Sequence, residues 1–281
     1  MKVFVIGAGQ MGSGIAQVSA QAGYDTYLYD NAPAAIEKGM AYVEGNLQRN
    51  VDKGRITPER KEEVLSCLTP VQSLNDAADC DLVIEAIIEN MEIKSNVFRQ
   101  LDEICKPETI FATNTSSLPI TSIAAVTKRP EKVIGMHFMN PVPVMTLVEV
   151  IRGLETDEET LATIFKASEE MGKVAIEVRD VPGFISNRVL QVMINEAIYC
   201  VYEGVATPEG IDEIMKRGMS HPMGPLQLAD FIGLDTILSV LEIMYKGYGD
   251  PKYRPCPLLR QMVSAGRYGK KSGRGFYDYR R

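Results

Sequence analysis

The chain has 281 residues, of which 45% are hydrophobic and 24% charged, a balance typical of a globular protein with one large domain or two smaller ones. Its formal net charge of −7 argues against binding to nucleic acid or to a membrane surface, so an anionic ligand would need a local basic patch. Five widely spaced cysteines with no Cys-x-x-Cys pair argue against zinc and disulfides, and no apolar run approaches a membrane span, which favours a cytoplasmic protein.

The first part of the chain is predicted to alternate strands and helices. The apolar run "KVFVIGAG" reads as a strand rather than a signal peptide, and "YDTYLYD" reads as a second strand that ends at Asp30. Residues 32–66 are predicted to be a polar helical insertion, in which Thr57 and Pro58 have the positions of a helix cap and a first helical residue. Further strands are expected at "CDLVIEAI", "TIFATNT", "KVIGMHF", "LVEVI" and "KVAIEV". This alternation predicts a parallel, doubly wound α/β sheet.

The second part of the chain contains helical runs only, such as "SNRVLQVMINEAIYCVYEG" and "TPEGIDEIMKRG". Val181, Pro182 and Gly183 interrupt the earlier pattern, so we place a domain boundary there. The prediction is an α/β domain over residues 1–182 and an all-α domain over residues 183–281. The tail "GRYGKKSGRGFYDYRR" is expected to be an ordered loop held by its aromatic side chains.

The segment "GAGQMG" follows the first strand and places Gly7, Gly9 and Gly12 in a Gly-x-Gly-x-x-Gly pattern. Because the segment also opens a helix and precedes a strand that ends in an acid, it favours a dinucleotide-binding turn over a purely structural glycine turn. Asp30 would accept hydrogen bonds from the adenine ribose and would repel a 2′-phosphate. We therefore expect NAD as the cofactor rather than NADP.

Polar residues also follow the strand "TIFAT", where Asn114 and Ser116 stand in "NTSS". Ligands of doubly wound sheets gather at the carboxyl ends of the strands, so both side chains are candidates for contact with a ligand. They are equally typical of a cap for the helix that Pro119 would begin, and the two interpretations can hold together.

The stretch "MHFMNPVPVMTLVEV" has His137 near the carboxyl end of one predicted strand and Glu149 in the middle of the next. An isolated histidine in an apolar strand is more often structural. A carboxylate in an apolar strand needs a partner, however, and the turn between the two strands would bring Glu149 back to His137. Such a pair is a histidine oriented by an acid, which is an arrangement for general acid–base catalysis.

Three further features have a structural and a functional interpretation. Asn187 in "GFISNRVL" either starts a helix or faces a cleft between the domains. His221 in "SHPMGP" is expected in a turn or in domain packing rather than in catalysis. The basic residues of the helical insertion are either a solvated helix face or a site for phosphates. These basic residues are Arg49, Lys53, Arg55, Arg60 and Lys61.

Seven segments together resemble the short-chain L-3-hydroxyacyl-CoA dehydrogenase family, and within it the bacterial 3-hydroxybutyryl-CoA dehydrogenases. They occur in the order and spacing of that family over essentially the whole chain. The resemblance implies a Rossmann-type doubly wound domain with a helical-hairpin insertion, followed by an all-α domain for substrate binding and homodimer formation. The segments are "GAGQMGSGIAQ", "DLVIEAIIEN", "NTSSLPIT", "GMHFMNPVPVMTLVEVI", "DVPGFISNRV", "HPMGPLQLADFIGLD" and "GKKSGRGFYDY".

The resemblance also implies roles for individual residues. His137 is implied as the general acid/base and Glu149 as its partner. Ser116 and Asn187 are implied as catalytic residues that face the substrate, and no metal is implied. Contacts to the CoA group are expected from Lys53, Arg49, Arg55 and Ser116. Contacts to the cofactor are expected from Gly7, Gly9, Gln10, Met11, Gly12, Asp30, Glu89, Lys94, Asn114, Ser116, Asn140 and Lys271.

The activity implied by the resemblance is the reversible oxidation of (S)-3-hydroxybutyryl-CoA, or another short-chain 3-hydroxyacyl-CoA, to the 3-ketoacyl-CoA with NAD. Two other activities remain open: a broad-chain 3-hydroxyacyl-CoA dehydrogenase of β-oxidation, or a β-hydroxyacid dehydrogenase that acts on a free acid. A non-enzymatic NAD-binding protein of the same fold is a further alternative, against which the intact catalytic set argues. The expected setting is butyrate or butanol metabolism.

Overall fold

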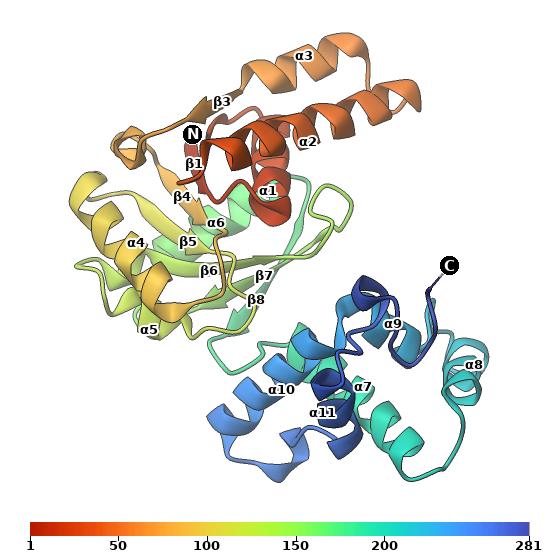
Figure 1. Cartoon of the computed structure of the whole chain (residues 1–281). Helices are drawn as coiled ribbons and strands as arrows, with labels where there is room; N and C mark the ends of the chain where they lie inside the picture. Colours follow the sequence, from red (N-terminus) through yellow and green to blue (C-terminus); the bar gives the residue numbers. More distant parts are fainter. Residues whose placement is uncertain (281) are drawn as a thin grey trace. The chain divides into compact units, whose positions relative to one another are not determined.

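The structure, a computed structural model, describes residues 1–280. It divides into two compact units, a first unit of Met1–Asp180 and a second unit that begins at Val181 (Figure 1). Each unit has a hydrophobic core of its own and is described by itself. Within residues 1–280, none of the helices combines the length and the apolar character that crossing a bilayer requires.

The first unit is built on one eight-stranded sheet with the order β3-β2-β1-β4-β5-β6-β7-β8 (Figure 1). The central strands β4, β5 and β6 are buried along their whole length, as expected for continuous apolar runs in a sheet that is covered on both faces. The predicted α/β fold is therefore confirmed. The strands are β1 (Lys2–Ile6), β2 (Asp25–Tyr29), β3 (Leu68–Val71), β4 (Leu82–Glu85), β5 (Ile110–Thr113), β6 (Val133–Phe138), β7 (Leu147–Arg152) and β8 (Val174–Arg179).

One feature of the sheet departs from a purely parallel order but agrees with the predicted return of "LVEVI" after the turn, and one strand was not predicted. Neighbouring strands are parallel except that β7 runs antiparallel to β6, because the turn of residues 139–146 is too short to contain a crossover helix. The strand β3 has no counterpart among the predicted strands. Its Pro70 argues against a central strand, but β3 lies at the edge of the sheet and pairs only with β2, where a proline is tolerated.

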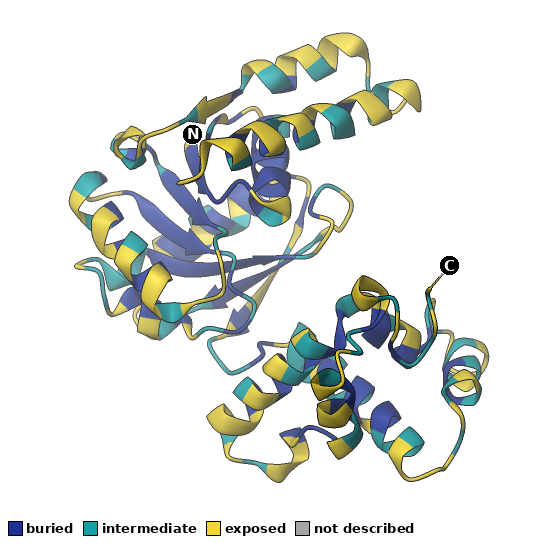
Figure 2. Cartoon of the chain, viewed as in Figure 1, coloured by how far each residue is buried: buried dark blue, intermediate teal, exposed yellow. Residues whose placement is uncertain are grey.

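Helices flank the sheet and form the predicted hairpin insertion. The helices α2 and α3 pack against each other as two antiparallel arms, whose outward faces are largely exposed (Figures 1 and 2). The helix α3 begins as predicted: the Thr57 hydroxyl accepts the N–H of Arg60 at 3.2 Å, and Pro58 is the first helical residue. The helices of this unit are α1 (Gln10–Gln21), α2 (Pro33–Asp52), α3 (Pro58–Ser66), α4 (Met91–Ile104), α5 (Ile120–Ala124) and α6 (Glu158–Glu170).

The second unit is helical, as predicted, and its tail is part of its packing. Asp230 accepts the backbone N–H groups of Phe276 and Tyr277, each at 2.9 Å, and both aromatic side chains pack on the core of the unit. The Tyr277 hydroxyl donates to Asp212 at 2.7 Å. The helices are α7 (Ser186–Tyr202), α8 (Pro208–Gly218), α9 (Pro225–Ile232), α10 (Leu234–Tyr248) and α11 (Pro257–Ser264).

Candidate active site

The turn between β1 and α1 has the geometry that a bound dinucleotide requires. Gly7 has a φ of +101°, and a Cβ there would lie 2.5 Å from the Ala86 carbonyl oxygen. A Cβ at Gly12 would lie 1.6 Å from the carbonyl oxygen of Gly7, so only glycine permits this close approach. At Gly9, by contrast, a Cβ would meet no atom within 4 Å, which leaves the N-terminus of α1 open to an anionic group.

A cavity of about 700 Å³ opens beside this turn. Asp30 lies in its wall at the end of β2, and its carboxylate accepts the backbone N–H groups of Ala8 at 2.9 Å and Ala32 at 3.0 Å. Ile88, Ile93 and other apolar side chains provide surface for a flat ring. Among the described residues that line the cavity there is no lysine or arginine for a 2′-phosphate, so the site fits NAD.

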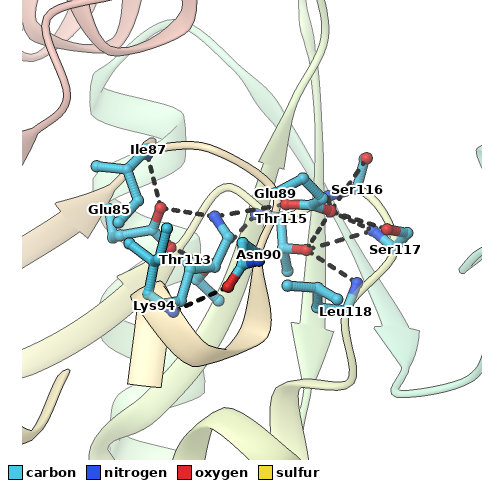
Figure 3. A network of polar contacts seen from close by, with 11 residues as sticks. Glu85, Ile87, Glu89, Asn90, Lys94, Thr113, Thr115, Ser116, Ser117 and Leu118 are labelled. Atoms are coloured by element: carbon cyan, nitrogen blue, oxygen red, sulfur yellow. Dashed lines mark hydrogen bonds and ion pairs between the residues drawn. The ribbon is translucent and has the colours of Figure 1, made fainter. Parts of the chain in front are cut away.

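A buried ion pair lies at the carboxyl end of β4 (Figure 3). The Lys94 ammonium of α4 is 2.6 Å from Glu85 Oε1, and the two side chains are 1% and 0% exposed. Glu85 also accepts the Ile87 N–H and the Thr113 hydroxyl, each at 2.7 Å. Lys94 thus follows Ile93 of the cavity wall in the chain, and its charge is engaged by Glu85, a partner that was not predicted from the sequence.

Glu89 connects this ion pair to the loop after β5 (Figure 3). Its Oε2 lies 3.4 Å from Lys94, and its Oε1 accepts the N–H groups of Ser116 and Ser117 at 3.0 Å and the Thr115 hydroxyl at 2.6 Å. Burial alone would raise the pKa of the Glu89 carboxyl, but the Lys94 ammonium and the hydroxyl donors hold that pKa below its ordinary value. An ionised Glu89 therefore fixes the backbone that carries Ser116, whose hydroxyl is 3.3 Å away.

His137 and Glu149 face each other across β6 and β7. They are directly opposite in the antiparallel register, and His137 Nδ1 lies 2.8 Å from Glu149 Oε2. The residues are 9% and 2% exposed, so the carboxylate is removed from water and held against the imidazole. Asn114 lies nearby, because its side-chain oxygen accepts the Phe138 N–H at 2.9 Å. The arrangement suits an imidazole that exchanges a proton while the acid fixes its orientation.

The other residues expected at the site fall in three places. Asn140 follows β6, and its side-chain oxygen accepts the Gln10 amide at 3.1 Å, which ties the turn of residues 139–146 to the start of α1. Arg49, Lys53 and Arg55 are exposed around the end of α2, and Arg49 contacts Asn46. Arg60 and Lys61 engage groups of the first unit instead: Arg60 donates to Glu63 and the Gln21 carbonyl, and Lys61 to Gln48.

Two expected site residues belong to the second unit. Asn187 lies in the first turn of α7, and its side-chain oxygen accepts the Gln191 amide at 3.2 Å. Lys271 lies in the tail, with its ammonium 2.6 Å from Asp235. The structure adds no metal site, because residues 1–280 contain no group of three or more His, Cys, Asp or Glu side chains arranged to hold an ion.

Comparisons with known proteins identify the family. The model of the 3-hydroxyacyl-CoA dehydrogenase NAD-binding domain matches residues 2–181, and that of the 3-hydroxyacyl-CoA dehydrogenase C-terminal domain matches residues 183–279. A probable 3-hydroxybutyryl-CoA dehydrogenase of Bacillus subtilis is 62% identical over 278 residues, covering 99% of this chain and 97% of that protein. A 3-hydroxybutyryl-CoA dehydrogenase of Bradyrhizobium diazoefficiens is 54% identical over 283 residues, covering 99% and 95%.

A solved structure agrees with these sequence matches. The crystal structure of (S)-3-hydroxybutyryl-CoA dehydrogenase PaaH1 from Ralstonia eutropha has a TM-score of 0.98 and 48% sequence identity, covering 100% of this chain and 99% of that one. The family resemblance inferred from the seven segments is confirmed. The chain belongs to the 3-hydroxyacyl-CoA dehydrogenase family of oxidoreductases, and its first unit is the NAD-binding domain of that family.

Proposed function

We propose that the protein catalyses the reversible NAD-linked oxidation of (S)-3-hydroxybutyryl-CoA to acetoacetyl-CoA. The main support for the proposal is the buried His137–Glu149 contact of 2.8 Å. His137 lies near the carboxyl end of β6, and the dinucleotide turn follows the carboxyl end of the parallel strand β1. The probable 3-hydroxybutyryl-CoA dehydrogenase at 62% identity and the 3-hydroxybutyryl-CoA dehydrogenase at 54% identity support this choice of substrate.

In this proposal His137 moves the proton of the 3-hydroxyl group. Because Nδ1 is engaged with Glu149, proton transfer takes place at Nε2. The Glu149 carboxylate keeps the ring in the tautomer that carries hydrogen on Nδ1, and it stabilises the imidazolium that forms during oxidation. In the reverse direction the imidazolium returns the proton to the oxygen at C3.

NAD, when bound, supplies the hydride acceptor. The residues of the first unit that we propose to hold it provide an open helix N-terminus and the ribose-binding Asp30. Its proposed contacts are Gly7, Gly9, Gln10, Met11, Gly12, Asp30, Glu89, Lys94, Asn114, Ser116 and Asn140, with Lys271 from the second unit.

We assign substrate contacts to a second set of residues. Ser116 donates a hydrogen bond to a substrate oxygen, from a backbone that Glu89 holds in place. Lys53 contacts the CoA phosphates, followed in importance by Arg49 and Arg55. The chain as a whole is negatively charged, so an anionic group must be met by a local cluster of exposed cations such as these. We assign Asn187 the same role as Ser116, the donation of a hydrogen bond to a substrate oxygen. The variant Asn187→Ala tests this role, and its kcat with acetoacetyl-CoA should fall.

The test is steady-state reduction of acetoacetyl-CoA and of longer 3-ketoacyl-CoAs, each with NADH and with NADPH. We expect the highest kcat/KM for acetoacetyl-CoA with NADH. Equal values for chains of about four to sixteen carbons would instead favour the broad-chain enzyme of β-oxidation. Turnover of free acetoacetate but not of its CoA ester would favour a β-hydroxyacid dehydrogenase.

We also propose that the enzyme is a homodimer. The second unit exposes large apolar side chains, among them Tyr202, Val205, Ile214 and Met219, which supports a homodimer formed through this unit. Analytical ultracentrifugation tests it, and a single species with the mass of one chain would reject it. A cytoplasmic location and a role in butyrate or butanol metabolism are proposed on the family resemblance.

A further inference from the structure

Lys173 is a buried cation that the proposed mechanism does not use. It stands immediately before β8 and is 7% exposed. Its ammonium donates to the Val142 carbonyl at 2.6 Å and to the Met145 carbonyl at 2.7 Å. Burial lowers the pKa of Lys173 from its ordinary value, as expected for an ammonium taken out of water. A cation is a costly residue to bury, so its contacts call for an explanation.

Both carbonyls belong to the turn of residues 139–146, which connects β6 to β7. The turn is fixed on its other side by α1, because Val142 is 2% exposed and a Cβ at Gly14 would lie 2.9 Å from the Val142 side chain. The Val174 N–H donates to the Thr146 carbonyl at 2.7 Å, next to Lys173. The turn is therefore clamped between the dinucleotide-binding helix and the start of β8.

The turn separates the two residues of the candidate acid–base pair. His137 lies just before it in β6, and Glu149 lies just after it in β7. In an antiparallel pair, the connecting turn sets which residues stand opposite each other. Asn140, at the start of the same turn, is held by Gln10 of α1. A loosened turn would thus disturb the acid–base pair and one wall of the cofactor site together.

We propose that Lys173 is a positioning residue for the reaction, which holds the turn of residues 139–146 so that His137 and Glu149 stay in contact and Asn140 stays beside Gln10. The inference rests on the proposed function for its kinetic consequences. Charge-assisted hydrogen bonds to two carbonyls restrain the backbone more strongly than neutral donors do, which explains why a cation is placed there.

The test compares Lys173→Met with the control Thr109→Val. The control removes one buried hydrogen bond, from the Thr109 hydroxyl to the Cys80 carbonyl at 2.7 Å, at the opposite end of the strands. Rates of acetoacetyl-CoA reduction are measured with NADH and with NADH deuterated at the transferred position. For Lys173→Met we expect kcat to fall about ten-fold and the isotope effect on kcat to rise, because a displaced acid–base pair slows the chemical step. For Thr109→Val, both quantities should match the wild type.

The outcomes that overturn the inference are distinct from those that reject the proposed function. A Lys173→Met enzyme with the wild-type kcat overturns it. A kcat that falls in proportion to the fraction of folded enzyme, with an unchanged isotope effect, also overturns the inference, because Lys173 would then have only a structural role. If Lys173→Met does not fold, Lys173→Gln, which keeps an amide donor, should show a smaller change in the same direction.

Hydrogen exchange gives a readout that needs no substrate. The N–H groups of Val144 and Met145 both donate to the Pro141 carbonyl at 3.0 Å, and their exchange should become faster in Lys173→Met than in Thr109→Val. Unchanged exchange in residues 139–146 overturns the inference whatever the activity. A wild-type enzyme that does not reduce acetoacetyl-CoA rejects the proposed function, and this exchange measurement then decides whether Lys173 holds the turn.

Discussion

Two carboxylates of the first unit are both buried in strands of the sheet, but they have different partners. Glu85 ends β4 and Glu149 lies in β7, and they are 0% and 2% exposed. Glu85 is 2.6 Å from an ammonium, whereas Glu149 is 2.8 Å from an imidazole. An ammonium holds its proton at neutral pH, while an imidazole can exchange one. Burial of an acid in a strand therefore indicates a polar network, and the partner of the acid decides whether that network can transfer protons.

The strongest test of this contrast removes the exchanging partner. His137→Gln should lower kcat by about 10³-fold, because the imidazole that accepts the hydroxyl proton is replaced by an amide that is not a base. NADH affinity, measured by fluorescence titration, should change little, since the dinucleotide turn is untouched. His221→Gln is the matched control, as it removes the other histidine of the chain, which lies in the second unit. Similar losses in both variants would contradict the role of His137.

A smaller effect is expected when the acid of the pair is neutralised. Glu149→Gln should lower kcat by about 10²-fold, because the amide preserves the shape of the side chain but lacks the negative charge that stabilises the imidazolium. The pH dependence of kcat should shift as well. If the kcat and its pH profile both match the wild type, Glu149 has only a structural role in the sheet and takes no part in proton transfer.

The matching change at the other carboxylate should affect stability more than rate. Glu85→Gln leaves the buried Lys94 ammonium with Glu89 as its remaining acid, so the free energy of unfolding should drop by about 3 kcal/mol. The kcat should stay within about ten-fold of the wild type, since the hydrogen bonds described here link Glu85 to Ser116 through intermediate residues, among them Lys94 and Glu89. Denaturant unfolding together with kcat checks both parts. A kcat loss as large as that of Glu149→Gln would remove the distinction between the two acids.

The smallest effect concerns the pH dependence of stability at Glu89. Its folded-state pKa lies below the ordinary value of 4.5, so its ionised form stabilises the fold above that pH. This contribution should be lost as the pH falls through the lowered folded-state pKa. The stability advantage of the wild type over Glu89→Gln should therefore be largest near neutral pH and shrink below about pH 4.5. Thermal unfolding midpoints measure it, and a pH-independent difference would show that the charge of Glu89 is unimportant.

The sequence predicted most of the fold because its signals are local. Continuous apolar runs, glycine turns and helix caps identified the α/β sheet, the hairpin and the helical second unit. The edge strand β3 was missed because Pro70 is unfavourable in a strand unless the strand lies at an edge, and edge position is a property of the whole sheet. The antiparallel direction of β7 followed from the short turn before it rather than from the strand itself.

The site was predictable only where one residue type implied another. A carboxylate in "LVEVI" called for a partner, and His137 was the available one. The same signal was present in "DLVIEAI", yet Glu85 was overlooked, because its partner Lys94 lies on the following helix and had been assigned to the cofactor instead. Lys173 was not predicted for a similar reason. Its acceptors are backbone carbonyls, which every residue has, so the sequence does not indicate them.

The tail of the second unit has a consequence for the order in which the protein folds during synthesis. The first unit possesses every strand of its sheet once residue 179 has been made. The second unit must wait longer, because the buried carboxylate of Asp230 accepts backbone N–H groups of Phe276 and Tyr277, near the end of the described residues. On the ribosome, the NAD-binding unit therefore can form first, while the helical unit completes its packing only after residues 276 and 277 have emerged.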